Sequence, residues 1–138
     1  MTAKIDEYFD RIERQLLLSP VVLALQVRER EERLQEGFIR LRATLYNGDL
    51  LEAFEFVVIA PDGIQTRTYR IHWQREDRRL RCRWDNAPHH QEVATFPHHV
   101  HRDVAEHVEP SEPMTILKVL AFVESDLQRD ERPSQGEA

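Results

Sequence analysis

The sequence predicts an α+β domain: a twisted antiparallel sheet of about five strands, in meander order, with an N-terminal and a C-terminal helix packed on one face. Two observations predict this fold. Apolar residues recur with a helical period near both ends of the chain, and they alternate with a period of two in between. The 138 residues, of which 41% are hydrophobic, are enough to bury a core without cross-links.

The first helix is expected near the N-terminus, where apolar residues form one stripe of an amphipathic helix. This stripe contains Ile5, Tyr8, Phe9, Ile12 and Leu16. Ser19-Pro20 ends the helix, because a residue before proline avoids the helical region. A second helix is expected after Ser111-Glu112-Pro113, since proline near a helix start loses no hydrogen bond. Its buried stripe contains Ile116, Leu117, Leu120, Val123 and Leu127.

Strands are expected where apolar and polar residues alternate. They cover residues 21–28, 39–45, 51–60, 69–74 and 80–85. Asn47-Gly48 and Pro61-Asp62-Gly63 predict tight turns between consecutive strands. Residues 86–113 are rich in proline and histidine and have no clear period, so we expect an ordered loop there. Loops of this length are commonly functional.

The domain is expected to cover residues 1–127, followed by a disordered polar tail over residues 128–138. No apolar run approaches the ~20 residues that a membrane crossing needs. The N-terminus carries acids where a signal peptide has basic and apolar residues, and Cys82 is the only cysteine. These features predict a cytoplasmic protein without a disulfide and without contact with a membrane.

Charge is distributed unevenly along the chain. The net charge of −6 argues against a general nucleic-acid binder. Residues 67–83, however, contain seven arginines and two acids, so this segment carries +5 and the rest of the chain −11. Such polarity suggests an anionic partner at one place, although arginines on strands can also simply keep one sheet face hydrated.

Six of the seven histidines lie within the 30 residues 72–101. Pro-His-His occurs twice, at 88–90 and at 97–99, and each proline restricts the backbone just before a histidine pair. If the 69–85 hairpin turns at Asp77-Arg78, residues whose numbers sum to 155 face each other. The resulting pairs on the polar face are Gln74 with Arg81, His72 with Arg83, and Arg70 with Asp85.

This patch suits phosphate chemistry. Imidazole transfers protons near neutral pH, and arginine binds phosphate and stabilises the charge that develops on it. The leading hypothesis is therefore RNA cleavage without a metal or other cofactor. The candidate catalytic residues are His72, Arg83, Asp85, His89 and His98. The candidate substrate-binding residues are Arg70, Arg81, Asn86, His90, His99 and His101.

Three other interpretations stay open. His99 and His101, with His89 or His90 and an oxygen from Asp85, could bind zinc or another transition metal in a metal-dependent hydrolase, although the spacing fits no zinc motif. The arginine hairpin could instead block a partner without catalysis. The paired histidines could also have a purely structural role.

Two histidine-containing stretches carry a resemblance to a known family. They are Arg83-Trp84-Asp85-Asn86-Ala87-Pro88-His89-His90 and Thr95-Phe96-Pro97-His98-His99-Val100-His101, preceded by Tyr69-Arg70-Ile71-His72. With a helix at each end, this pattern resembles the TumE-like toxins of prokaryotic type II toxin–antitoxin modules over roughly residues 5–127. The resemblance implies growth inhibition through RNA or translation, and a partner antitoxin with a helix-turn-helix DNA-binding domain. It assigns no residue roles.

An exposed edge strand is expected near Val21. Such an edge can pair with a strand of another chain, so a homodimer or strand addition by the antitoxin is a further possibility.

Overall fold

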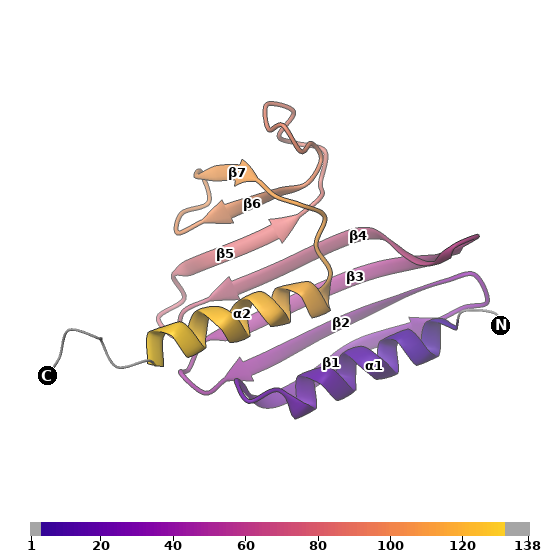
Figure 1. The fold of residues 1–138 in the computed structure, drawn as a ribbon, viewed down its shortest axis with the longest axis horizontal. Coiled ribbons are helices and arrows are strands. Elements are labelled where there is room, and N and C mark those ends of the chain that lie inside the picture. The colour runs from indigo at the N-terminus through magenta and orange to yellow at the C-terminus, as the bar shows by residue number, and fades with distance from the viewer. Residues whose placement is uncertain (1–3, 132–138) are drawn as a thin grey trace, which may run out of the picture.

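A computed structural model describes residues 4–131 of the chain (Figure 1). Helix α1 spans Ile5–Leu18 and helix α2 spans Ile116–Glu131. Between them lie β1 (Val22–Glu32), β2 (Glu36–Leu45), β3 (Leu50–Ala60), β4 (Gly63–Gln74), β5 (Leu80–Asp85), β6 (His99–Arg102) and β7 (Val108–Pro110). The strands form one sheet in chain order, and every neighbouring pair is antiparallel.

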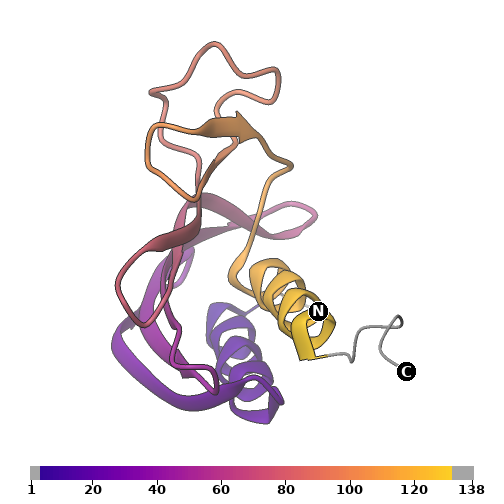
Figure 2. The same cartoon turned by 90° about the vertical axis from the view of Figure 1, so that its left-hand side faces the viewer.

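Both helices lie on the same face of the sheet, as the two views show (Figures 1 and 2). Phe9, Ile12 and Leu16 of α1 are fully buried, as the N-terminal stripe predicts. On α2, Phe122 packs edge-on against Trp73 and Trp84, with ring centroids 6.4 and 5.4 Å apart. The two helices therefore seal one side of the sheet, and we call the opposite side the open face.

The expected strand number is wrong: the sheet has seven strands, not about five. The two additional strands, β6 and β7, come from the segment expected to be a loop. β6 alternates His99, Val100, His101, and only Val100 faces the helices, opposite Trp84 of β5. Four residues with a single apolar member carry too weak a period to be recognised. The α+β class, the meander order and the terminal helices are confirmed.

The hairpin register is confirmed where it matters for the site. Arg70 pairs with Asp85, and His72 pairs with Arg83. The predicted Gln74–Arg81 pair is wrong, because a register shift after Trp73 places Leu80 opposite Gln74. The turn itself contains Arg78 with a φ of 74°, a backbone conformation that allows the tight reversal.

Helix α2 runs to Glu131, so residues 128–131, expected in the tail, are helical; residues 132–138 lie outside the described part of the chain. No helix within residues 4–131 is long and apolar enough to cross a membrane.

Candidate functional site

Strand pairing brings six predicted site residues into two rows across the open face. Arg70, Asp85 and His99 lie side by side on β4, β5 and β6, and the next row contains His72, Arg83 and His101. Neighbouring side chains within each row are about 5 Å apart at Cβ. The period of two along each strand therefore assembles the site, and β6 delivers two histidines to it.

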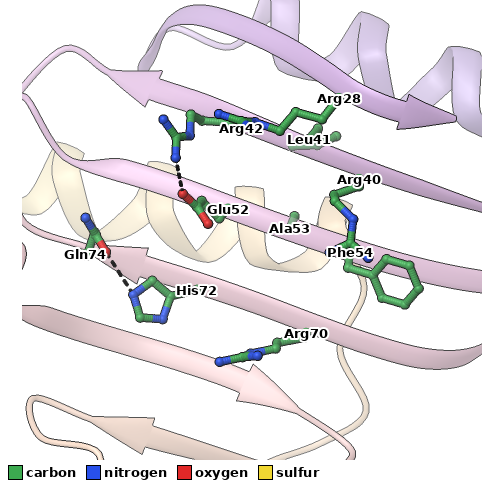
Figure 3. A pocket seen from close by; sticks show the side chains of 10 residues that line it. All are labelled: Arg28, Arg40, Leu41, Arg42, Glu52, Ala53, Phe54, Arg70, His72 and Gln74. Atoms are coloured by element: carbon green, nitrogen blue, oxygen red, sulfur yellow. Dashed lines mark hydrogen bonds and ion pairs between the residues drawn. The ribbon is translucent and has the colours of Figure 1, made fainter.

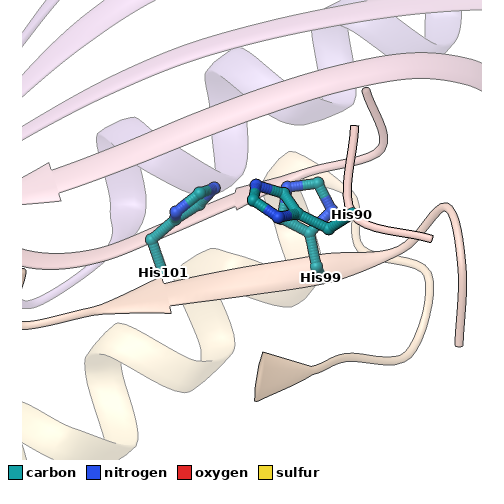
Figure 4. A group of neighbouring side chains, drawn as sticks. All are labelled: His90, His99 and His101. Carbon is teal, nitrogen blue, oxygen red and sulfur yellow. The ribbon is translucent and has the colours of Figure 1, made fainter. Parts of the chain in front are cut away.

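A third imidazole comes from the loop that follows β5. His90 folds back over β6, and its ring centroid lies 4.8 Å from that of His99 and 5.4 Å from that of His101 (Figure 4). The His99 and His101 centroids are 4.9 Å apart, and one nitrogen from each of the three rings lies within 4.8 Å of the others. His99 and His101 are buried, whereas His90 is half-buried. We call Asp85, His90, His99 and His101 the Asp85 cluster.

Asp85 is the buried carboxylate beneath these rings. Its Oδ1 lies 3.0 Å from His99 Nε2, and its Oδ2 lies 3.5 Å from His101 Nε2. The Ala87 backbone N–H donates to Oδ1 at 3.0 Å, and Arg83 Nε is 3.8 Å from Oδ2. One carboxylate thus faces two imidazoles and one guanidinium.

The outer nitrogen of each ring is fixed by an oxygen. His99 Nδ1 donates to the Pro97 carbonyl at 2.9 Å, and His101 Nδ1 donates to the Ala105 carbonyl at 2.7 Å. His90 Nδ1 lies 3.1 Å from the Glu92 carboxylate. Because carbonyl oxygens only accept hydrogen bonds, the proton of a neutral ring is on Nδ1 in His99 and His101. Their Nε2 atoms then present lone pairs to the interior of the cluster.

Two imidazoles on the open face have lowered pKa values. Burial lowers the pKa of His101, and nearby Arg83 lowers it further, although the bond to Ala105 opposes this. Burial also lowers the pKa of His72, helped by Arg83 and Arg70, while its hydrogen bond to Gln74 at 3.0 Å opposes the shift. Both rings are therefore biased towards the neutral form that can accept a proton or bind a cation.

The Asp85 cluster lines a cavity of about 690 Å³, and a second cavity of about 400 Å³ lies next to it on the same face. Both cavities share Arg40, Phe54 and Arg70. Figure 3 shows these residues in the lining of the smaller cavity. The Arg40 guanidinium lies 4.7 Å from the Phe54 ring centroid. Together the cavities are lined by six arginines against two carboxylates, Glu52 and Asp85. We call this surface the arginine groove; its arginines are Arg28, Arg40, Arg42, Arg67, Arg70 and Arg83.

The family model described as Toxin TumE matches residues 10–129, which includes the whole site. The chain belongs to the TumE toxin family. Membership confirms the predicted resemblance, supports a toxin role and implies an antitoxin partner in general terms. The comparisons with curated proteins and with solved structures find no match.

Not every predicted site residue reaches the Asp85 cluster of this TumE toxin. His98 lies on the helix side of the sheet, where its ring stacks on Tyr69 and its Nδ1 is 2.8 Å from the Tyr69 hydroxyl. Neighbours along a strand point to opposite faces, so His98 and His99 separate. His72 lines the smaller cavity, two strands from His101. The structure therefore separates two of the predicted catalytic histidines, His72 and His98, on opposite faces of the sheet.

Three other predicted site residues lie in different environments. Arg81 points to Asp49, with Nε 2.6 Å from Oδ2, and its guanidinium lies 5.4 Å from the Trp73 ring centroid. Asn86 joins the loop to β4, because its Oδ1 accepts from Tyr69 N and its Nδ2 donates to the Arg67 carbonyl. His89 is exposed at the mouth of the larger cavity.

The site also contains five residues that are not among those predicted from the sequence: Arg28, Arg40, Arg42, Phe54 and Arg67. A signal existed, since Arg40 and Arg42 alternate with the apolar residues of β2 and so share one face. What the sequence alone does not reveal is which faces of β2 and β4 coincide. Cys82 takes no part in the site: burial raises the pKa of its thiol to about 11, so it stays protonated.

Proposed function

We propose that this TumE toxin is a cytoplasmic endoribonuclease that inhibits growth by cutting RNA at the Asp85 cluster. The proposal retains the RNA substrate predicted from the sequence and revises the catalytic residues. The observation that carries it is the position of the Asp85 cluster at one end of a groove lined by six arginines. Phosphate binding and proton transfer are thereby available on one surface.

The arginine groove fits a single-stranded polyanion. Arginine side chains contact phosphates and supply most of the affinity for nucleic acid, whatever its sequence. Phe54 adds an aromatic ring on which a base can stack, next to Arg40. The charge is local, because the chain as a whole is acidic. Because the positive charge is local, it favours binding of an RNA strand along the open face rather than nonspecific binding of nucleic acid anywhere on the protein.

The chemistry is transesterification at a phosphodiester. An imidazole of the cluster takes the proton of the ribose 2′-hydroxyl on its Nε2 lone pair, and the 2′-oxygen forms a bond to phosphorus. The bond from phosphorus to the 5′-oxygen breaks, and protonated His89 at the cavity mouth donates its own proton to that oxygen. Arg83 and Arg70 stabilise the negative charge on the phosphorane. The products are a 2′,3′-cyclic phosphate and a 5′-hydroxyl.

The partner in this proposal is an antitoxin with a helix-turn-helix DNA-binding domain. The exposed side chains of Leu17, Leu18 and Leu23 lie where α1 turns into the edge strand β1. An apolar corner next to a free strand edge suits strand addition by another chain. A second copy of the toxin would compete for the same edge, and the mass of the purified protein distinguishes the homodimer from the complex.

The ribonuclease is tested with purified toxin and a labelled single-stranded RNA. We expect cleavage to leave 2′,3′-cyclic phosphate ends, and we expect Arg83→Ala and His89→Ala each to slow it by about 100-fold. His107→Ala removes an imidazole that is 59% exposed and lies outside both cavities, so this control keeps full activity. If the parent cuts no RNA, or Arg83→Ala cuts as fast as the parent, the proposal is wrong.

A further inference from the structure

We infer that the Asp85 cluster binds a divalent transition metal ion, through Nε2 of His90, His99 and His101 and a carboxylate oxygen of Asp85. The inference concerns the same residues as the proposed function but does not depend on RNA cleavage. It starts from the lone pairs that the neutral rings of His99 and His101 present to the Asp85 carboxylate.

The buried interior of the cluster contains an excess of acceptors. With Nδ1 of His99 and His101 donating to backbone carbonyls, both Nε2 atoms present lone pairs to the Asp85 carboxylate. His99 is 1% exposed, and its Nε2 has no hydrogen-bond partner among the described residues although Asp85 Oδ1 is 3.0 Å away. Buried polar atoms are rarely left unpaired. A cation held between these atoms satisfies all of them.

The outer shell has the form that metal-binding histidines need. A ligating imidazole almost always donates its other ring N–H to a carbonyl or a carboxylate, which fixes the ring and raises its basicity. All three rings meet this condition, through Pro97, Ala105 and Glu92. The rings thus have their outer nitrogens occupied, and one nitrogen of each ring lies within 4.8 Å of the others.

The donor set selects the kind of ion. Imidazole nitrogens with one carboxylate oxygen suit zinc and neighbouring transition metals, whereas magnesium and calcium prefer oxygen ligands. A tetrahedral zinc ion has metal–nitrogen bonds of about 2.0–2.1 Å, so the nitrogens, now within 4.8 Å of one another, have to draw together. His90 can supply this movement because it stands on a loop rather than on a strand.

An ion in this position would face the arginine groove. The cluster lines the larger cavity together with Arg70 and Arg83, so a phosphate oxygen or water can approach the metal from that side. Catalytic zinc sites have three protein ligands and an open position, and some expand to five-coordinate. With four protein ligands here, the phosphate oxygen or water would be the fifth ligand. The metal would lower the pKa of a bound hydroxyl group, which agrees with activation of a ribose hydroxyl in the proposed reaction.

The test is metal binding by the full chain, measured without RNA. Protein stripped with a chelator is titrated with Co²⁺ and with Zn²⁺, and binding is followed by the visible absorption of Co²⁺ and by its displacement with Zn²⁺. We expect one ion per chain, and a dissociation constant weaker by about 100-fold or more in His99→Ala and in His90→Ala. His107→Ala, the matched control, binds as the parent does.

The choice of His90→Ala also distinguishes loss of a metal ligand from loss of the fold. His90 is half-buried on a loop, so His90→Ala removes a ligand without opening the core, and circular dichroism verifies its fold. Absence of stoichiometric Co²⁺ and Zn²⁺ binding by the parent overturns the metal site, and so does unchanged affinity in the folded His90→Ala variant. RNA cleavage by metal-free protein overturns only the role of the metal in activating the ribose hydroxyl, whereas a protein that binds metal but never cleaves RNA overturns only the ribonuclease.

Discussion

Two buried carboxylates, one on each face of the sheet, have opposite surroundings. Glu55 of β3 lies under the helices and meets only donors: the hydroxyls of Tyr8 at 2.5 Å and Thr66 at 2.6 Å, and the backbone N–H of Ile116 at 3.3 Å. Asp85 of β5 lies on the open face and meets two imidazole nitrogens that have their own protons elsewhere. Glu55 therefore stabilises the fold through hydrogen bonds, whereas Asp85 faces two imidazole nitrogens that have no proton to donate to it.

Glu55 connects elements that are distant in the chain. Its side chain joins α1, the start of β4 and the first turn of α2 in one network that is buried between the helices and the sheet. Burial raises the pKa of Glu55. Burial also raises the pKa of Tyr8, and the negative charge of the neighbouring Glu55 carboxylate raises it further. A buried network of this kind rigidifies the structure only while every member is satisfied.

The largest effect is expected from substitution of Asp85. Asp85→Asn keeps the shape of the side chain but removes its charge, so RNA cleavage is expected to fall by about 100-fold to 1000-fold. The unfolding free energy should change by less than about 1 kcal/mol, since the acceptor-rich cluster adds little stability. Rates on a labelled RNA and urea unfolding measure the two quantities, and a large loss of stability with normal cleavage would reverse the roles assigned to the two acids.

Glu55→Ala is expected to have the complementary effect on stability. The substitution leaves two hydroxyls and one backbone N–H buried without an acceptor, which costs about 3 kcal/mol of unfolding free energy. Urea unfolding followed by circular dichroism measures the loss. Glu52→Ala is the matched control, because Glu52 lies three residues earlier on the same strand with a side chain that is 47% exposed, and its loss should cost under 1 kcal/mol.

The pH dependence of stability sharpens the same comparison. Because the pKa of Glu55 is raised in the folded state, the folded protein holds this proton more tightly than the unfolded chain does. The contribution of Glu55 to stability is therefore fully present below its ordinary pKa of 4.5 and is lost as the pH rises through the folded pKa.

Glu55→Gln removes that titration. The unfolding free energy of the Gln variant, relative to the parent, is expected to increase as the pH is raised from 4.5 to 7. Urea unfolding at three pH values within this range provides the measurement. A constant difference between the two proteins would show that the buried carboxyl does not titrate in this window.

A smaller effect is expected from single arginines of the groove. Arg40→Ala should weaken binding to single-stranded RNA about 3-fold to 10-fold and reduce its salt dependence, because a phosphate contact is lost. Arg79→Ala, at the exposed hairpin tip, is the control and should bind RNA like the parent. Equal losses in both variants would favour the binding-module interpretation, in which the hairpin rather than the groove contacts the partner.

The sequence predicts the apolar side of the molecule more reliably than the polar one. The apolar stripes of α1 and α2 are buried as expected, because an amphipathic helix has a single apolar face and that face packs on the core. On β3, Phe54, Phe56 and Val58 share a face as the alternation requires, yet this is the open face, and the core face contains Glu55. Alternation identifies two faces but not which of them the helices cover.

The site was predicted in part for the same reason. Register within a hairpin follows from its turn, so the sequence alone predicts the pairs Arg70–Asp85 and His72–Arg83. The path of the histidine-rich segment depends on contacts distant in sequence, such as the pairing of His99 with Asp85 and the stacking of His98 on Tyr69. These contacts decide which of two adjacent imidazoles enters the cluster.

The strictly sequential strand order has a consequence for a nascent toxin. Synthesis delivers the chain from the N-terminus, and segments can fold once they leave the ribosome. The cluster requires residues 85–101, and the sheet beneath it is sealed by α2, which follows β7 along the chain. The Asp85 cluster therefore assembles only after nearly all of the described chain has been translated, so the ribosome that makes this protein does not meet the completed site earlier.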